Sequence, residues 1–270
     1  MNLKSKTALA ALTLIASSTV FAQAKPPEPD YTLAYNIGAV SDYRFRGITQ
    51  TNYGPAVQGG VDFAHKSGFY LGAWASNVNW VKQFNGAGKG DYEVDLYGGY
   101  KGEIKAGLSY DVGFITYQYP GNDSGDVGTQ GAGAYSNAST KEFYGAITYN
   151  VATLKYSQSM GDFLGNLNSN GSRYLDLSAT FDLGSGYSLT PHVGRQTVPN
   201  QSAGTKTGNA ADYTDYALTL GKDLGNGLAV SVAYYATDAS QDFYNNQGAP
   251  AGDGKFIAKS GAAVGVKYSF

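Results

Sequence analysis

The sequence predicts an all-β fold: a single antiparallel up-and-down transmembrane β-barrel of about 12 strands, which occupies residues 31–270. Three observations predict it. Apolar and polar residues alternate along many short segments, the connections between these segments fall into two length classes, and tyrosines stand near many segment ends. Alternation with a period of two places every second side chain on the same face of a strand.

The composition limits the classes of protein that remain. The chain has 23 tyrosines and 37 glycines among 270 residues, and only 15% of its residues are charged. Its formal charge is −2 and it has no basic run, so nothing favours a nucleic-acid partner. No long apolar run follows residue 22, which excludes a membrane-spanning helix there. A closed barrel is compatible with this, because its strands satisfy one another's backbone groups in lipid.

The first residues are typical of a secretory signal peptide. Lys4 and Lys6 precede an apolar stretch, TALAALTLIASSTVF, and small residues follow in Ala22-Gln23-Ala24. We expect cleavage after Ala22, or after Ala24; an N-terminal membrane anchor is disfavoured because the apolar stretch is short. Residues 1–22 are then a cleaved leader and 23–30 a short periplasmic segment. The leader removes two bases, so 17 bases face 21 acids and the mature charge is −4. Without cysteine, disulfides do not hold the exported fold.

Twelve alternating segments follow along the mature chain. In YTLAYNIGA, Tyr31, Leu33 and Tyr35 share one face, and in DYEVDLYGGY, Glu93 and Asp95 lie opposite the apolar residues. Valine, threonine and tyrosine recur while leucine is sparse, which favours strands over helices. The expected strands are residues 31–45, 55–65, 68–79, 91–101, 104–119, 140–150, 151–160, 172–182, 187–197, 212–222, 227–237 and 259–270.

The connections between these strands alternate in length. Those after the even-numbered strands are tight (HKSG, KGE, YNV, DLGSG and KDLGNG), and those after the odd-numbered strands are longer and polar. Short turns at one end and long loops at the other are typical of outer-membrane barrels. The alternative, a soluble sandwich, would carry many lysines and glutamates on its polar face. Here that face mixes small, aromatic and scattered charged residues, as expected of a lumen.

Tyrosines stand near both ends of the expected strands. An amphipathic ring is favoured at the level of lipid headgroups, so these residues are expected to form two girdles. The simpler interpretation of any single one is that tyrosine favours strands. The expected girdle residues are Tyr31, Tyr43, Tyr92, Tyr117, Tyr119, Tyr149, Tyr187, Tyr213 and Tyr268.

The last strand, GAAVGVKYSF, must pair with the first if the barrel closes. Val264, Val266, Tyr268 and Phe270 are then expected to face lipid, and Lys267 to face the lumen. A terminal phenylalanine on such a strand resembles the C-terminal signature that the barrel-assembly machinery of Gram-negative bacteria recognises.

Several segments also resemble one protein family. They are SDYRFRG, PAVQGG, SGFYLGAW, DYEVDLYGGYKGE, YQYPG and the late stretch DYTDYALTLGKDLGNGLAVSVAYYATDA. Over nearly all of the mature chain the sequence is similar to the TorF family of porins. The resemblance implies an outer-membrane barrel with porin character, and it supplies neither a substrate nor binding residues.

The alternation also predicts which residues line the lumen. Arg44 and Arg46 are expected to point inward and Tyr43 and Phe45 outward; the arginines form either a charged constriction or a salt bridge in the wall, for example with Asp62. Eight acids against four bases predict a weak preference for cations. The candidate pore-lining residues are Asp42, Arg44, Arg46, Asp62, Glu93, Asp95, Asp111, Glu142, Lys155, Asp176, His192, Asp215 and Lys267.

Barrel width limits what can pass. Wide aqueous channels belong to barrels of about 16 to 18 strands, so 12 strands leave a narrower bore. Inward aromatics are expected to narrow it again, or to fill it and leave a plugged, structural barrel. These aromatics are Tyr70, Trp74, Tyr97, Tyr144, Tyr174 and Tyr235.

Enzymatic chemistry finds little support in the sequence. A hydrolase needs a histidine beside its nucleophile, yet His65 and Ser67 lie in a tight turn, and His192 has no serine two residues on. No zinc-protease, phosphate-loop or nucleophile-elbow motif occurs. GNDSGD could bind calcium, but a solvated loop is the simpler interpretation. We therefore expect no reaction, no metal and no cofactor.

The expected function is passive diffusion of ions or small polar solutes through a narrow lumen in the bacterial outer membrane. The expected partners are outer-membrane lipid, the assembly machinery during biogenesis, and the permeating ion or solute. Two alternatives remain: a non-conducting barrel whose loops bind an external partner, and a barrel hydrolase.

Overall fold

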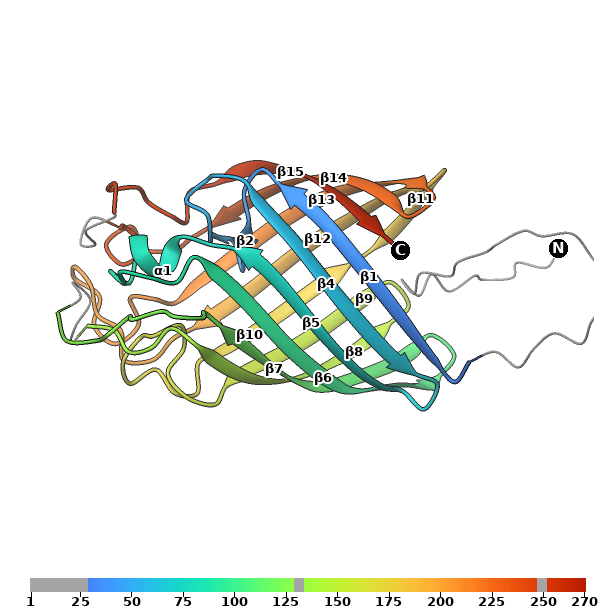
Figure 1. Ribbon diagram of the computed structural model, residues 1–270, viewed down its shortest axis with the longest axis horizontal. Coiled ribbons are helices and arrows are strands. Elements are labelled where there is room, and N and C mark those ends of the chain that lie inside the picture. The colour runs from blue at the N-terminus through green and yellow to red at the C-terminus, as the bar shows by residue number, and fades with distance from the viewer. Residues whose placement is uncertain (1–28, 129–133, 247–251) are drawn as a thin grey trace, which may run out of the picture.

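A computed structural model describes residues 29–128, 134–246 and 252–270. The expected leader, residues 1–22, and residues 23–28 of the expected N-terminal segment lie outside the described residues. The described chain forms one barrel of strongly tilted strands, with the long loops gathered at one end and the tight turns at the other (Figure 1). These ends are called the loop end and the turn end below.

Twelve antiparallel strands close the barrel, as the alternation predicts. Each pairs with its neighbours in the chain, and β15 pairs with β1 to complete the ring. One strand is interrupted after Ala179, so its halves carry separate labels, β10 and β11, and both pair with β12. The strands are β1 (Tyr31–Val40), β4 (Ala56–His65), β5 (Phe69–Asn77), β6 (Tyr92–Lys105), β7 (Leu108–Gln118), β8 (Thr140–Tyr149), β9 (Ala152–Ser159), β10 (Arg173–Ala179) with β11 (Phe181–Gly184), β12 (Tyr187–Thr197), β13 (Tyr213–Gly225), β14 (Leu228–Thr237) and β15 (Gly261–Ser269).

The turn end is built from the tight connections that the sequence predicts. In Ser185-Gly186 and in Asn226-Gly227, both residues have a positive φ, between 52° and 80°. Such two-residue turns match the twist of a β-hairpin, and glycine or asparagine adopts them at little cost. One turn lies later than expected: β6 runs on to Lys105 and turns at Ala106-Gly107, not at KGE.

The first strand is shorter than expected, and its end is the main difference from the predicted fold. β1 ends at Val40, and the chain then forms a small hairpin from β2 (Arg44–Phe45) and β3 (Ile48–Thr49) before β4 begins. The hairpin pairs with none of the barrel strands. Residues 42–52 are called the inner hairpin below.

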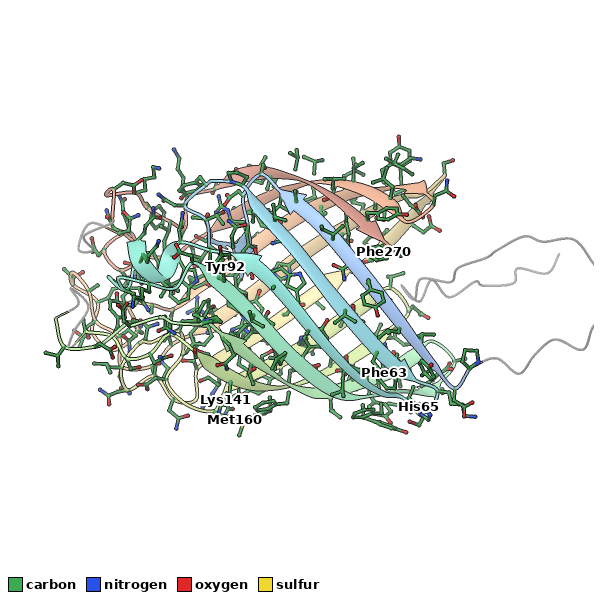
Figure 2. The ribbon with its side chains drawn as sticks, in the orientation of Figure 1. Phe63, His65, Tyr92, Lys141, Met160 and Phe270 are labelled. Atoms are coloured by element: carbon green, nitrogen blue, oxygen red, sulfur yellow. The ribbon has the colours of Figure 1, made fainter. Side chains whose placement is uncertain are left out.

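The outer surface of the wall is apolar. Outward residues such as Leu33, Leu177 and Val264 are about half exposed, and their neighbours in sequence point inward. Tyr31, Tyr92, Tyr149, Tyr187 and Tyr268 are exposed near strand ends. Figure 2 places Tyr92, Lys141 and Met160 toward the loop end and Phe63 and His65 toward the turn end. The girdle prediction is wrong for Tyr43, Tyr117, Tyr119 and Tyr213, which lie inside the molecule.

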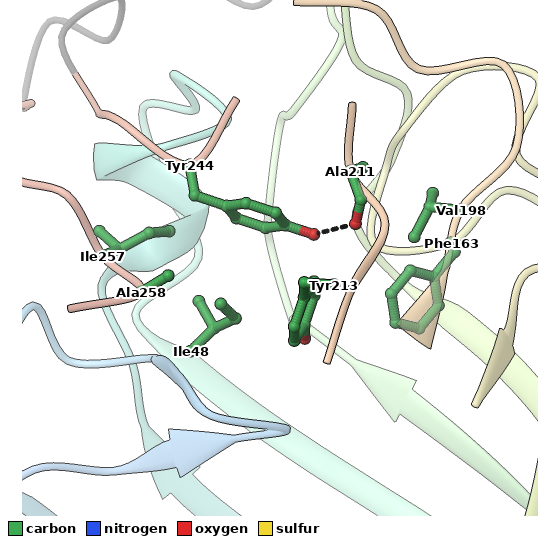
Figure 3. Close-up of a cluster of buried hydrophobic side chains, with 8 residues drawn as sticks. All are labelled: Ile48, Phe163, Val198, Ala211, Tyr213, Tyr244, Ile257 and Ala258. Atoms are coloured by element: carbon green, nitrogen blue, oxygen red, sulfur yellow. Dashed lines mark hydrogen bonds between the residues drawn. The ribbon is translucent and has the colours of Figure 1, made fainter. Parts of the chain in front are cut away.

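The loops carry the hydrophobic core. All six long connections contribute buried apolar side chains to two adjoining clusters, and Phe45 and Leu164 pack against both. Figure 3 shows one cluster, in which the Tyr244 hydroxyl donates a hydrogen bond of 2.7 Å to the carbonyl of Ala211. A short helix, α1 (Trp80–Gln83), belongs to the other. We call these clusters the loop cap: Ile48, Phe163, Val198, Ala211, Tyr213, Tyr244, Ile257 and Ala258, with Val78, Trp80, Val81, Ala87, Tyr117, Tyr119 and Ala138. Within the described ranges no helix is long and apolar enough to cross a membrane.

Candidate functional site

The lumen holds a cavity of about 480 Å³ beneath the inner hairpin. Residues of β7, β9, β10, β12, β13 and β14 form its wall, and the tip of the hairpin forms its roof. Its polar wall residues are Lys155, Ser157, Tyr174, Asp176, Ser178, Thr190, His192, Asp215 and Thr219. The cavity therefore gives a polar solute room inside the barrel.

Two of the inward aromatic rings lie against the wall. Tyr97 stands opposite Gly72 on the neighbouring strand, and its ring covers the glycine so closely that a Cβ there would be 2.2 Å from it. Tyr144 covers Gly113 in the same way. The expectation that these rings narrow the bore assumed that they project toward the axis; a cross-strand glycine lets each ring lie flat instead.

Two tyrosine hydroxyls donate to luminal acids in the half of the barrel nearer the turns. Tyr97 donates to Asp62 over 2.5 Å, and Tyr70 donates to Asp111 over 2.6 Å. A neutral hydroxyl satisfies a carboxylate oxygen without removing its charge. Neither acid forms an ion pair within the described ranges.

His192 lies between two aspartates on the cavity wall. Its Nδ1 is 2.8 Å from Asp176 and its Nε2 is 2.8 Å from Asp215, while the Tyr174 hydroxyl also donates to Asp215. Both ring nitrogens face carboxylate oxygens, which only accept hydrogen bonds, so this geometry favours the doubly protonated imidazolium. Neither nitrogen then faces a serine whose proton it could take.

The inner hairpin brings its two arginines inside the barrel, but in ion pairs other than the one considered with Asp62. Arg44 Nε contacts Asp42 over 2.6 Å, and Arg44 Nη1 donates to the carbonyls of Gly47 and Lys259 over 2.9 Å. Asp42 also accepts the hydroxyl of Thr49 over 2.5 Å. These bonds fix the base of the hairpin.

The outward direction expected for Tyr43 and Phe45 is wrong. The Tyr43 hydroxyl donates to Glu93 over 2.9 Å and its ring packs edge-on against Trp74. Phe45 packs edge-on against Tyr117, also inside the barrel. The alternation of the first strand stops at Val40, so it cannot assign faces to the hairpin residues.

Arg46 at the tip of the hairpin reaches the far wall of the lumen. Its Nη2 is 2.7 Å from Glu142 on β8, and its Nη1 donates to Gln196 on β12 over 2.7 Å. Its guanidinium lies 4.3 Å from the ring centre of Tyr174. The side chains of Arg46 and Glu142 are only 7% and 1% exposed, so this is a buried ion pair. Gln196 is not among the predicted pore-lining residues, because these were selected for their charge.

Glu93 and Asp95 point inward from β6 as expected, but they lie beneath the loop cap and away from water. They are 1% and 7% exposed, and each has one carboxylate oxygen without a hydrogen-bond partner within the described structure. Neither forms an ion pair within the described ranges. Burial without a cationic partner disfavours the charged form of a carboxyl group, so neither acid is placed to set the luminal potential while the cap is closed.

Lysines supply further luminal charge. Lys155 lines the cavity, and its ammonium lies 4.1 Å from the ring centre of Tyr144. Lys267 is exposed on the luminal face of β15. Lys101, on the same face of β6 as Tyr97, was missed because the fourth strand was expected to end there. A predicted strand that ran on to Lys105 would have included Lys101 among the inward residues.

The last strand has the two faces that its sequence predicts. Val264, Val266, Tyr268 and Phe270 are 44–58% exposed on the outside. β15 pairs with β1, and Phe270 and Tyr35 exchange backbone hydrogen bonds of 2.9 and 3.0 Å. Phe270 is thus held in the closing seam of the barrel.

The remaining polar motifs are local. His65 Nδ1 is 2.8 Å from the Ser67 hydroxyl within one exposed turn. No group of three or more histidine, aspartate, glutamate or cysteine side chains in the described ranges is placed to hold a metal ion. Asp123 of the GNDSGD loop accepts the backbone N–H groups of Gly88 and Lys89, so it links two loops.

Asp253 links the inner hairpin to the last loop. It accepts hydrogen bonds from the amides of Asn52 and Asn246 over 2.8 and 2.9 Å, and Lys255 Nζ lies 2.7 Å away. Slight burial opposes its charge, but the hydrogen bonds from Lys255, Asn246 and Asn52 outweigh this and hold the pKa of Asp253 well below its usual range.

Porins are among the solved structures with a similar fold. A KdgM porin in complex with disordered oligogalacturonate has a TM-score of 0.51 at 10% identity, over 88% of this chain and 98% of that chain. The NanC porin has a TM-score of 0.49 at 11% identity, over 88% and 99% of the two chains. The outer membrane protein OprD from Pseudomonas aeruginosa has a TM-score of 0.39 at 11% identity, over 80% and 59%. At these identities the likeness is one of fold: a porin-like transmembrane β-barrel.

Sequence comparison gives a family rather than a function. Among curated protein sequences, none matches the chain significantly. The TorF resemblance stays a prediction, because the family model that matches is a different one by name. That model is described as "Bacterial protein of unknown function (Gcw_chp)" and matches residues 23–270, so the chain belongs to the Gcw_chp family.

Proposed function

We propose that the protein is an outer-membrane channel through which ions or small polar solutes diffuse passively. The observation that carries this proposal is a closed, porin-like barrel with an apolar outside and a polar cavity of about 480 Å³ inside. A water-soluble protein has no reason to expose a continuous apolar belt, whereas a bilayer requires one. The flattened aromatic rings support a bore that stays open toward the turn end.

The proposed orientation follows from the two ends. Long loops face the outside of the cell and tight turns face the periplasm in barrels of this type. Outer-membrane lipid then covers the apolar belt, with exposed tyrosines at both of its edges. Export by the leader at residues 1–22, and recognition of Val264, Val266, Tyr268 and Phe270 by the assembly machinery, belong to the same proposal.

Selectivity is proposed to be weaker than a count of charges implies. Asp42 and Glu142 are neutralised by arginines, and Asp176 and Asp215 share His192. Asp62 and Asp111 then face three luminal lysines that form no ion pair within the described ranges, Lys101, Lys155 and Lys267. Because charged rings set the potential inside a pore, this near balance supports a small solute of either sign.

The experiment is conductance of purified protein in a planar bilayer. Folded protein should give discrete, small steps, and its reversal potential in a salt gradient should lie near zero. Protein unfolded by heat before addition is the control and should give none. Failure of well-folded protein to conduct in any variant, including the variant without its inner hairpin described below, would refute the channel and favour a barrel that only binds partners.

A further inference from the structure

The inner hairpin crosses the whole bore. It leaves the wall between β1 and β4, yet Tyr43 contacts β5 and β6, and Phe45 contacts β7. Arg46 contacts β8, β10 and β12. The hairpin therefore meets strands on the side of the barrel opposite its own attachment.

The tip of the hairpin packs closely against the far wall, and its backbone conformation is strained. Arg46 and Gly47 form the turn, with φ of 48° and 80°. A positive φ is unfavourable for arginine and persists only where its surroundings impose it. Gly47 has no room for a side chain, since a Cβ there would lie 2.9 Å from Cβ of Asp215 and 2.7 Å from Cγ2 of Thr237.

Arg46 supplies the charge that holds this fit. Its guanidinium is satisfied by Glu142 and Gln196 and covered by the ring of Tyr174. Glu142 has the Tyr117 hydroxyl, 3.2 Å away, as its only other recorded donor in the described structure. Removing one partner of a buried ion pair leaves the other charge uncompensated, and this is strongly unfavourable.

The loop cap seals the space above the hairpin. Val81, Ala138, Val198 and Ala211 are at most 1% exposed, although they belong to loops at the mouth of the barrel. The hollow that remains between the hairpin and the loops measures only about 40 Å³ and has apolar walls. Among the described residues, buried apolar side chains therefore fill the space between the loop end and the hairpin.

We propose that the inner hairpin and the loop cap together form a gate at the loop end, and that Arg46 is the positioning residue that holds this gate closed. The inference rests on the proposed channel function. The gate opens when the Arg46–Glu142 pair breaks and the hairpin leaves the far wall; the cavity then connects to both ends of the barrel.

The test compares full-length variants in planar bilayers. Arg46→Met keeps the bulk of the side chain and removes its charge, and Arg46→Lys restores a charge. Arg195→Met is the matched control, because Arg195 is the neighbour of Gln196 on the outer face of β12 and is 49% exposed. A further variant replaces residues 43–51 by a short Gly/Ser linker. Heat-induced gel mobility shifts verify that each barrel is folded.

The expected ranking separates the gate from the channel. Wild type should open rarely, Arg46→Met should raise the open probability on the order of 100-fold, and Arg46→Lys should lie between them. Arg195→Met should match wild type, and the linker variant should stay open. Steady opening of wild type would overturn the gate and leave the channel standing. A closed Arg46→Met beside an open linker variant would overturn the role of Arg46, and a silent linker variant would overturn channel and gate together.

A reversible cross-link provides an independent test. Cβ atoms of a disulfide lie about 3.5–4.5 Å apart; a Cβ at Gly47 would be 2.9 Å from that of Asp215, so the tip must shift slightly for the bond to form. With no native cysteine to interfere, Gly47→Cys combined with Asp215→Cys should be silent when oxidised and should conduct when reduced. Equal conductance in both states, with the cross-link verified by mass, would contradict a moving hairpin.

Discussion

The wall and the loop cap of this barrel are built on opposite rules. In the wall, apolar side chains such as Leu177 point outward and acids such as Asp215 point inward. In the loop cap, apolar side chains such as Val81 are buried, as in the core of a soluble domain. One chain therefore has an inside-out part that requires lipid and a conventional part that requires water.

This difference shows which part is able to move. Wall strands are held by continuous backbone hydrogen bonds around a closed ring, so they cannot open one at a time. The loop cap is held by side-chain packing and by hydrogen bonds between loops, such as those from Thr49 to Ile257 and from Ser136 to Gly165, and these can break without disturbing the ring. A gate in such a protein belongs in the cap.

The largest difference between the loop cap and the wall is expected when one phenylalanine is removed from each. Phe163 is buried in the cap and Phe181 is 43% exposed on the wall. Phe163→Ala should destabilise the cap by about 3–5 kcal/mol and should speed proteolysis of the loops in detergent. Phe181→Ala should leave the loops protected. Equal protection of both variants would mean that the cap has no core of its own.

A smaller effect is expected where rings lie on glycines. Gly72→Ala pushes a methyl group into the ring of Tyr97, which then must leave the wall. We expect a loss of about 1–3 kcal/mol, measured as a lower temperature of the gel mobility shift, and a smaller conductance in the linker variant. Gly145→Ala is the control, since a methyl group there meets only Val112 at an ordinary 3.9 Å. A Gly72→Ala barrel as stable as the control would contradict the flat packing.

The wall could be predicted from the sequence, and the loop cap could not. Period-two alternation fixes the faces of Glu93 and Asp176 correctly, because a strand in a closed ring has only two faces. The loop cap has no period: Val81, Phe163 and Tyr244 lie far apart in the sequence, and only the folded loops bring them together. The alternation of β1 likewise gave no sign that it ends at Val40, so the path of the inner hairpin could not be predicted.

The loop cap also decides whether the two buried acids of β6 contribute charge to the lumen. Glu93→Gln combined with Asp95→Asn should leave the ion selectivity of the full chain unchanged. In the linker variant the same pair should move the reversal potential toward anions, since two exposed negative charges are lost. Asp62→Asn, nearer the turn end of the lumen, should move the reversal potential both in the full chain and in the linker variant. A shift in the full chain from the Glu93 and Asp95 changes would mean that the cap leaks.

The smallest effect is expected at Asp253, where a polar contact joins the inner hairpin to the last loop. Because its pKa is lowered in the folded protein, Asp253 contributes its full stabilisation at neutral pH. That contribution is lost only as the pH falls below the usual range of an aspartate. The group is largely exposed, so Asp253→Asn should cost less than about 1 kcal/mol and should speed loop proteolysis slightly at pH 7. Asp91→Asn, whose partner Lys82 lies within the same loop, is the control. Equal rates of loop proteolysis in Asp253→Asn and Asp91→Asn would show that the bond from Asn52 to Asp253 does not hold the inner hairpin. The apolar packing of the loop cap would then hold it alone.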